Sequence, residues 1–429
     1  MIFVRIYRTD RCDDKELYAL LQKRAEVSGA DITQKVREVI ENVKANKDKA
    51  LLEYCEKFDR CIPSSLVATQ EEIDTAAAKA PVDLVKIMKE AADNIRIYHE
   101  KQMCSGYEFE SKGKTLGRIV RPLKRVGVYV PGGTAAYPST VLMNCIPAKV
   151  AGVEEIILVT PPKPEGLNPI IAAAAKIAGV DKVICVGGAQ AVAALAYGTQ
   201  SVPKVDKIVG PGNMFVAEAK RQVYGVVNID MIAGPSEVCI VADSTANPKY
   251  VSADLLSQLE HDRAASAVLI TTDEQLAKKV NCEIYVQLEK LGRKEIASVS
   301  LESWSAIVIA KDIEDAFRVS NIIAPEHLEI VTENPKDKLY LVENAGSIFI
   351  GEYSPEPMGD YFAGTNHVLP TSGTARFSSP LSVDDFLKKM SYLSYSHESF
   401  ERDAQSVIGF AEVEGLDAHA NSVKVRLEK

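Results

Sequence analysis

The stretch "KVICVGGAQAVAALAY" (residues 182–197) decides the fold class, because it joins a strand pattern to a helix pattern through one tight turn. Residues 182–186 are mostly apolar, two glycines follow, and residues 188–197 are rich in Ala and Leu. A short apolar strand, a glycine turn and a helix in this order are typical of a parallel βαβ unit. The chain is therefore predicted to be an α/β protein.

The same alternation of strand and helix patterns continues on both sides of this stretch. Ala- and Leu-rich segments such as 168–179 predict helices between the strands. Two series of strands in one chain predict two Rossmann-like αβα lobes with open, mostly parallel sheets, whose ligands bind beyond the carboxyl ends of the strands. The predicted strands are 126–130, 156–160, 182–186, 207–209 and 238–242 in the first series, and 267–272, 305–310, 327–331 and 347–350 in the second.

Both ends of the chain have helical patterns instead. Residues 13–58 and 70–104 place apolar side chains at helical spacing. After about residue 380 the strand signal fades, and the remaining segment also has a helical pattern. We expect helical N-terminal and C-terminal extensions, of which the second could dock on its own lobe or cross to a partner subunit.

Composition excludes several classes of function. The chain has 429 residues, 46% apolar and 25% charged, with a net charge of −9. Because nucleic-acid binding needs a basic surface, no nucleic-acid partner is expected. The eight cysteines show no CxxC pair, and neither a signal peptide nor an apolar run of membrane-spanning length is present. These features predict a globular cytoplasmic protein with reduced thiols and no membrane partner.

Three glycine-rich turns follow predicted strands, at residues 129–139, 186–195 and 209–216. Such turns let backbone N–H groups approach a phosphate. None is a complete fingerprint, since the last lacks its third glycine and Gly133 stands where a P-loop requires lysine. A nucleotide site and ordinary βα turns both remain open.

The segment "ADLLSQLEHDRAAS" (253–266) is predicted to form one amphipathic helix. On it, Asp254, Gln258 and His261 fall on a stripe separate from the leucines. An oxygen donor and a nitrogen donor one turn apart could bind a metal, or the stripe could be a solvated surface.

Other polar segments also allow two interpretations. Glu326 and His327 in "IAPEHLEI" (323–330) could form an acid/base pair at a sheet edge or a solvated loop pair. The loop "MGDYFAGTNHVLP" (358–370) could be functional or a plain turn. Cys145 could trap an aldehyde, but its apolar neighbours favour a buried, inert thiol. A mixed set of Gln258, His261, Asp360 and His419 would suit zinc, with manganese as a competitor.

Taken together, these stretches resemble the L-histidinol dehydrogenase family, in order, from about residue 30 to 427. The resemblance implies a zinc-dependent homodimeric enzyme that oxidises L-histidinol through L-histidinal to L-histidine with NAD+. An alternative is a related dehydrogenase acting on another amino alcohol or a sulfonated diol, and another is a metal-binding protein without turnover. The stretches that carry the resemblance are "RVGVYVPGGTAAYPSTVLMN", "GGAQAVAALAYGT", "VDKIVGPGNMFVAEAK", "DMIAGPSEV", "DLLSQLEHD", "APEHLEI", "GDYFAGTNHVLPT" and "VEGLDAHANSV".

The resemblance also implies roles for individual residues. Glu326 and His327 match the catalytic acid/base pair, with His327 expected to take the hydroxyl proton and Glu326 to activate water. The residues that match the zinc ligands are Gln258, His261, Asp360 and, from the other subunit, His419. Tyr129, Gln190 and Asn213 match the NAD contacts. Those that match substrate contacts are Ser236, Glu414 across the dimer interface, His327 and the four metal ligands.

Two acidic residues near the expected ligands are left open. Asp262 departs from the family pattern, which often has glycine there, and could tune metal affinity or point to water. Asp254 could hydrogen-bond a metal ligand or face solvent.

The resemblance assigns the segments as follows. Residues 1–24 form an N-terminal arm, and 25–129 with 237–380 form a first αβ lobe that carries the metal and catalytic residues. Residues 130–236 form a second, NAD-binding lobe, and 381–429 form a helical tail for dimerisation.

Overall fold

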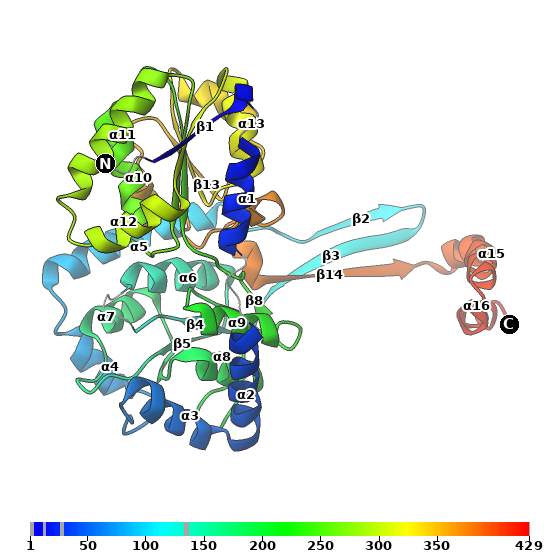
Figure 1. Cartoon of the computed structure of the whole chain (residues 1–429). Helices are drawn as coiled ribbons and strands as arrows, with labels where there is room; N and C mark the ends of the chain where they lie inside the picture. The colour runs from blue at the N-terminus through cyan, green and yellow to red at the C-terminus, as the bar shows by residue number, and fades with distance from the viewer. Residues whose placement is uncertain (1–3, 12–13, 26–29, 133–136, 429) are drawn as a thin grey trace. The chain divides into compact units, whose positions relative to one another are not determined.

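The computed structural model describes residues 4–11, 14–25, 30–132 and 137–428 and shows a mixed α/β architecture with helices at both ends (Figure 1). The predicted fold class is confirmed. The chain divides into two compact units, one made of residues 1–102 and 123–386 and the other of residues 103–122 and 387–429. Along the described parts, no helix combines the length and apolar character needed to cross a bilayer.

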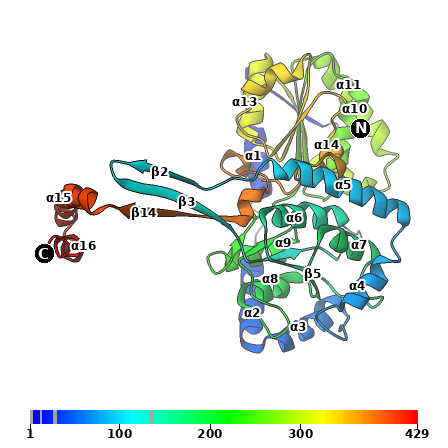
Figure 2. The same cartoon turned by 180° about the vertical axis from the view of Figure 1, so that it is seen from behind.

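The first sheet of the larger unit is six-stranded and parallel. Helices α10, α11 and α12 share a core with one face, while α1 and α13 share a core with the other. This separation is visible in Figure 1 and from behind in Figure 2. A parallel sheet covered on both faces needs apolar side chains on both, which explains its continuous apolar strands. In spatial order the strands are β1 (Arg5–Arg8), β11 (Ala306–Ile309), β10 (Ser266–Thr271), β9 (Glu237–Ala242), β12 (His327–Val331) and β13 (Ser347–Ile350).

The second sheet of this unit is five-stranded and also parallel. Helices α2, α3, α8 and α9 share one core with its strands. Figure 1 shows α6 and α7 on the opposite face. In spatial order the strands are β6 (Lys182–Cys185), β5 (Glu155–Thr160), β4 (Arg125–Tyr129), β7 (Lys207–Val209) and β8 (Asn228–Ile229).

The helices are bounded as follows: α1 (Asp14–Ala25), α2 (Ala30–Asn46), α3 (Asp48–Tyr54), α4 (Gln70–Ala77), α5 (Val82–Glu100), α6 (Pro138–Ala151), α7 (Pro169–Ala178), α8 (Gly188–Tyr197), α9 (Met214–Val223), α10 (Pro248–Leu259), α11 (Glu274–Leu288), α12 (Lys294–Trp304), α13 (Ile313–Ile323), α14 (Glu356–Met358), α15 (His397–Val413) and α16 (Asp417–Lys424). Short helical turns are η1 (Thr9–Arg11), η2 (Cys55–Asp59), η3 (Pro335–Leu341), η4 (Gly359–Ala363), η5 (Thr374–Arg376) and η6 (Val383–Phe386).

Both parallel sheets have the same strand order. If the strands of each sheet are numbered along the chain starting from β9 or β4, their order across the sheet is 3-2-1-4-5. The first sheet has β1 in addition, beside β11. The direction of winding reverses between β9 and β12 in one sheet and between β4 and β7 in the other. Such switch points are where α/β sheets form ligand crevices.

The predicted boundary between the first and second lobes, at residues 129/130, is wrong. Strand β4 is the central strand of the second sheet, between β5 and β7. Helix α2 buries Val36, Ile40 and Val43 in the same core as α8 and α9. The second lobe therefore starts near α2, because the apolar stripe of that helix has its partners there and not on the first sheet.

The prediction that residues 381–429 form a purely helical tail is also wrong. Residues 387–395 form β14 (Leu387–Tyr395), which pairs antiparallel with β3 (Lys114–Pro122), and β3 pairs with β2 (Tyr107–Ser111). The side chains of β14 are exposed or half-buried along its whole length. Without a buried face the sequence lacks the apolar alternation that identifies a strand. The helical part of the prediction holds for α15 and α16.

Candidate active site

Glu326 and His327 lie at the switch point of the six-stranded sheet. His327 is the first residue of β12 and pairs in register with Val238 of β9. The site residues of this lobe therefore gather at the amino edge of the strands, where the sequence analysis expected the carboxyl edge. The reason is local: the acid/base pair stands at the start of β12 and not at its end.

The ring of His327 is held in one orientation. Its Nδ1 lies 2.9 Å from the carbonyl oxygen of Glu237. Because a carbonyl only accepts hydrogen bonds, Nδ1 carries the proton of the neutral ring. Its Nε2 is buried without a hydrogen-bond partner among the described residues, 3.6 Å from Oδ1 of Asp360 and 4.0 Å from Oε1 of Glu356. The lone pair of Nε2 therefore faces the polar centre of the site.

Glu326 is held by the same peptide. Its Oε2 accepts a hydrogen bond from the amide of Glu237 at 2.8 Å and lies 3.6 Å from Nδ1 of His327. Burial raises the pKa of Glu326 to about 7. Burial alone would lower the pKa of His327, but the charges of Glu326 and Asp360 outweigh it and raise that pKa to about 9.

Donor atoms suited to a divalent cation surround Nε2 of His327. The ligand atoms of His327, Glu356 and Asp360 all lie within 4.8 Å of one another. Burial alone would raise the pKa of Asp360, but His327 outweighs it and lowers that pKa to about 2, so this carboxylate is ionised. The side chain of Gln258 on α10 is fully buried, and neither its oxygen nor its nitrogen has a partner in the described chain. An unpaired buried amide is costly, and a cation that took the Gln258 oxygen as ligand would remove part of that cost.

The predicted helix 253–266 is wrong in its bounds. Helix α10 runs from Pro248 to Leu259, so His261 lies beyond its end. The helix ends here because Asp262 forms a turn, in which its Oδ1 accepts from the amide of Ala264 at 2.8 Å. This turn gives Asp262 a structural role and leaves His261 on a short loop after the helix.

His261 nevertheless belongs to the same electrostatic neighbourhood. Much of the residue is exposed, but the protein around its ring lowers its pKa, mainly by desolvation. The charge of Asp360 acts in the opposite direction and that of His327 in the same direction. The charges of Asp360 and His327 thus act on His261, whose role as a metal ligand stays a prediction.

Two residues near the centre were not predicted as site residues. Glu356 on α14 is 2% exposed, its Oε2 lies 3.4 Å from Oγ of Ser257, and burial together with Asp360 raises its pKa to about 8. His367 has a buried Nε2 without a partner among the described residues, and the charge of Asp360 acts on its pKa. His367 lies in the polar loop 358–370, which the sequence left open as functional or a plain turn, whereas Glu356 carries no sequence signal.

Asp254 takes neither of its two predicted positions. It hydrogen-bonds Glu329 of β12, and burial raises the pKa of Asp254 to about 6. Glu329 in turn accepts a hydrogen bond from the amide of Glu356 at 2.9 Å. Asp254 therefore supports the segment that carries Glu356, and among the described residues its carboxyl makes no hydrogen bond to the side chain of Gln258.

The remaining predicted residues of the metal and substrate set lie elsewhere. Ser236 is half-buried directly before β9, and its carbonyl accepts from the amide of Ser266 at 3.0 Å. Glu414 is the C-cap residue directly after α15 and His419 lies in α16, so both belong to the smaller unit, where both are exposed. That Glu414 and His419 of a second subunit lie close to Asp360 stays a prediction.

The predicted cofactor residues lie at the carboxyl edge of the five-stranded sheet. Tyr129 ends β4, and its hydroxyl accepts from the amide of Gly188 at 3.1 Å. Gln190 lies in the first turn of α8, and Asn213 caps α9 by accepting from the amides of residues 215 and 216. Tyr129 and Asn213 thus stand on the two sides of the switch point between β4 and β7.

The turn after β7 is rigidly built. Gly210 has φ +108°, and a Cβ there would collide with the carbonyl of Tyr129, so only glycine lets the two turns approach. Its amide donates to Asp230 at 2.8 Å, and Asp230 also forms a buried ion pair with Lys220. Residues 133–136 of the first glycine-rich turn lie outside the described residues.

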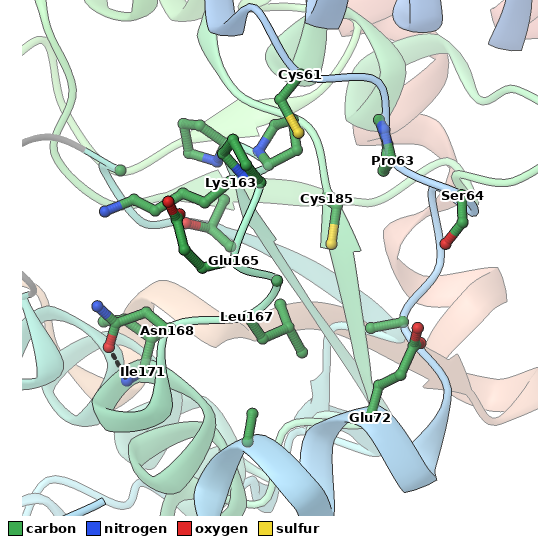
Figure 3. A pocket seen from close by; sticks show the side chains of 18 of the residues that line it. Cys61, Pro63, Ser64, Glu72, Lys163, Glu165, Leu167, Asn168, Ile171 and Cys185 are labelled. Atoms are coloured by element: carbon green, nitrogen blue, oxygen red, sulfur yellow. Dashed lines mark hydrogen bonds between the residues drawn. The ribbon is translucent and has the colours of Figure 1, made fainter. Parts of the chain in front are cut away.

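A cavity of about 870 Å³ opens beside this edge (Figure 3). Three of the residues that line it, Pro131, Thr160 and Cys185, lie at or just after the ends of strands. The other walls include residues of the segments 60–72 and 163–168. Its volume falls in the range of small-molecule sites. Since its walls come from the second sheet, the cavity belongs to the cofactor lobe and not to the acid/base pair.

Comparison with known proteins identifies the family of the chain. The family model described as histidinol dehydrogenase matches residues 22–427. The chain belongs to the histidinol dehydrogenase family. The family predicted from the sequence is confirmed, and with it the chain is an enzyme of the oxidoreductase class.

Relatives in the family cover nearly the whole chain. The histidinol dehydrogenase of Clostridium acetobutylicum is 54% identical over 427 residues, 99% of each chain. That of Bacillus cereus is 54% identical over 411 residues, 96% of each chain. The crystal structure of histidinol dehydrogenase from Elizabethkingia anophelis matches with a TM-score of 0.93 at 39% identity, covering 99% of this chain and 98% of its own.

The inert interpretation of Cys145 is supported within this family fold. The thiol lies in α6 and is fully buried. Burial raises the pKa of Cys145 far above its usual range, which suppresses the nucleophilic thiolate. Cys145 is therefore not a catalytic nucleophile.

Proposed function

We propose that the chain oxidises L-histidinol through L-histidinal to L-histidine, using two NAD+ and one zinc ion per subunit. The observation that carries the proposal is the orientation of His327, whose bare Nε2 faces an ionised Asp360 close to other cation donors. A buried base of this kind suits proton removal from an alcohol. The cytoplasmic location predicted from the sequence stays a prediction.

The proposed metal ligands are Gln258, His261 and Asp360 with His419 of the partner subunit. Their amide oxygen, imidazoles and carboxylate form a mixed donor set that zinc accepts, with manganese as a substitute. Zinc, when bound, would orient the amine and imidazole of the substrate as a Lewis acid, and NAD+ would accept the hydride in each oxidation. Ser236 and Glu414 of the partner subunit would complete the substrate site, which requires a homodimer.

His327 is the proposed base in both oxidations. Its Nε2 removes the hydroxyl proton, while Nδ1–H stays bonded to the carbonyl of Glu237. The resulting imidazolium is stabilised by the carboxylate of Glu326, 3.6 Å from Nδ1. A pKa of about 9 favours the protonated ring at neutral pH. Because the charge of Asp360 contributes to that pKa, a cation held by Asp360 would lower it toward the range of a working base.

Glu326 is proposed to activate the water that the second oxidation consumes. Its pKa of about 7 allows it to bind and release a proton near neutrality. The aldehyde is first hydrated, and the hydrate then loses a hydride and a proton to become the acid. The amide of Glu237 holds the carboxylate in place for this role.

The cofactor lobe is proposed to bind NAD+ through Tyr129, Gln190 and Asn213. Tyr129 is the last residue of β4, Gln190 and Asn213 lie beyond the carboxyl ends of β6 and β7, and Tyr129 and Asn213 flank the switch point. This is the position at which such sheets bind dinucleotides. The neighbouring cavity has room for part of the cofactor.

The test is NADH formation by the zinc-loaded protein with L-histidinol and, separately, with L-histidinal. Activity with both substrates, lost after dialysis against a chelator and restored by Zn²⁺ or Mn²⁺, is the expected result. A related dehydrogenase would instead prefer another amino alcohol or a sulfonated diol in the same assay. A metal-binding protein without turnover would form no NADH with any of them.

A further inference from the structure

Arg24 is a charged side chain in the interior of the first lobe. It lies near the end of α1, is 1% exposed, and is separated by more than 200 residues from its partners. Its Nη1 donates to the carbonyls of Ala264 at 3.0 Å and of Pro235 and Ser236 at 3.3 Å. Its Nη2 forms an ion pair with Oε1 of Glu237. Burying a guanidinium is costly, so this arrangement needs an explanation.

Glu237 connects Arg24 to the acid/base pair. The amide of Glu237 donates to Oε2 of Glu326 at 2.8 Å, and its carbonyl accepts from Nδ1 of His327 at 2.9 Å. Its side-chain Oε1 also accepts from the amide of Ser372 at 3.0 Å. One residue therefore orients both catalytic side chains through its backbone, and its side chain is held by Arg24.

We propose that Arg24 is a positioning residue, which fixes residues 235–237 so that the Glu237 peptide holds Glu326 and His327 in their reactive orientations. The inference rests on the proposed roles of that pair. A planar guanidinium can bond one carboxylate and several carbonyls at once, whereas an ammonium is a point charge that cannot reproduce this pattern. Without Arg24, Glu237 would be a buried carboxylate lacking its cation, and the segment would shift to hydrate it.

The alternative is that Arg24 only anchors α1 to the sheet. An anchor would affect stability and leave the chemistry of the folded enzyme unchanged. A positioning residue would also change kcat, because a displacement of about 1 Å at reacting groups can cost about 10²-fold in rate.

The experiment compares full-length, zinc-loaded Arg24→Ala and Arg24→Lys with the parent protein. We expect kcat for both oxidations to fall about 10²-fold in Arg24→Ala, with bound zinc and the KM for NAD+ unchanged. Guanidinium ions at low, non-denaturing concentration should restore part of kcat in Arg24→Ala, while ethylammonium should not. Arg24→Lys should fold and remain well below the parent in kcat.

The matched control is Arg125→Ala, which removes another Arg–Glu ion pair, with Glu155, at the amino ends of the neighbouring strands β4 and β5 in the second sheet. It should lower the melting temperature and leave kcat unchanged. If Arg24→Ala does not fold, Arg24→Lys and Glu237→Gln decide by the same measurements.

Two results would overturn the inference. One is that the Arg24 variants lose stability but keep the parent kcat, and the other is that they lose zinc in proportion to activity. Failure of the proposed function is distinguishable, since the parent protein itself would then form no NADH from L-histidinol.

Discussion

Nδ1 of His327 and the carbonyl oxygen of Glu237 lie 2.9 Å apart, so the neutral ring presents the lone pair of Nε2 to Asp360 and Glu356. The orientation is set by backbone and not by another side chain. A backbone acceptor has no pKa in the working range, so whenever the ring is neutral its proton is on Nδ1, whatever the pH.

Replacing His327 with Gln should lower kcat for both oxidations about 10²–10⁴-fold, because the amide cannot accept the hydroxyl proton. Bound zinc, measured by atomic absorption, should stay near the parent value. His397→Gln is the control, since that histidine is exposed at the start of α15. A variant at position 327 with parent-like turnover would remove His327 from the mechanism.

Glu326→Gln should separate the two half-reactions. Oxidation of L-histidinal should slow more than oxidation of L-histidinol, because only the second step consumes water. Stopped-flow measurement of NADH with each substrate gives the two rates. Equal losses in both steps would contradict the proposed water-activating role.

His261→Asn should release zinc and abolish activity together, since an amide replaces an imidazole ligand. Asp262→Asn is the matched control one residue away. Its side-chain oxygen can still accept from the amide of Ala264, so the turn after α10, the zinc content and kcat should persist. Stoichiometric zinc in purified His261→Asn would exclude His261 as a ligand.

Mixing His261→Asn with His419→Asn chains should restore activity if each site is built from two subunits. Random reassociation makes half of the dimers hybrids, and each hybrid has one intact site, so about a quarter of the parent activity is expected. Activity is measured after unfolding and joint refolding of differently tagged chains. Isolated hybrid dimers with no activity would show that residues 261 and 419 serve within one chain.

The pair Asp254 and Glu329 should make stability depend on pH. Burial raises the pKa of Asp254 to about 6 and that of Glu329 well above its ordinary value. A carboxyl group with a raised pKa in the folded state stabilises fully below its unfolded pKa, and this contribution is lost as pH rises through the folded pKa.

The free energy of unfolding should therefore fall from about pH 5 towards pH 8 more steeply in the parent than in Glu329→Gln, which cannot ionise. Urea titrations of both zinc-loaded proteins at several pH values measure this. Parallel pH profiles for the two proteins would show that Glu329 does not bind an extra proton in the folded state.

Much of the architecture could be predicted, because buried parallel strands leave a strong signal. The apolar runs 238–242 and 327–331 became β9 and β12 with nearly the same bounds. Strand β14 could not be found this way, since exposed side chains on both faces carry no apolar alternation. The boundary at residue 129 failed because sequence order does not reveal that α2 packs on the second sheet.

Residues of the candidate site could be predicted only where polar side chains are adjacent in the sequence or share one loop rich in possible metal-ligand atoms. Glu326 and His327 are adjacent, and Asp360 and His367 share one loop, so each could be noticed locally. Glu356 was missed because its position near His327 arises from the return of the chain after β13. The Arg24–Glu237 pair joins positions 213 apart, a separation that no local pattern encodes.

The strand β1 has a practical consequence for handling the protein. It is an edge strand of the six-stranded sheet, and β11 is its neighbour there. Trimming the chain past Arg8 would leave the backbone groups of β11 that face β1 without partners and free to pair with another molecule, while those that face β10 would stay paired. Shortened versions should therefore precipitate more readily than the full chain, even though the removed residues lie far along the sequence from the acid/base pair.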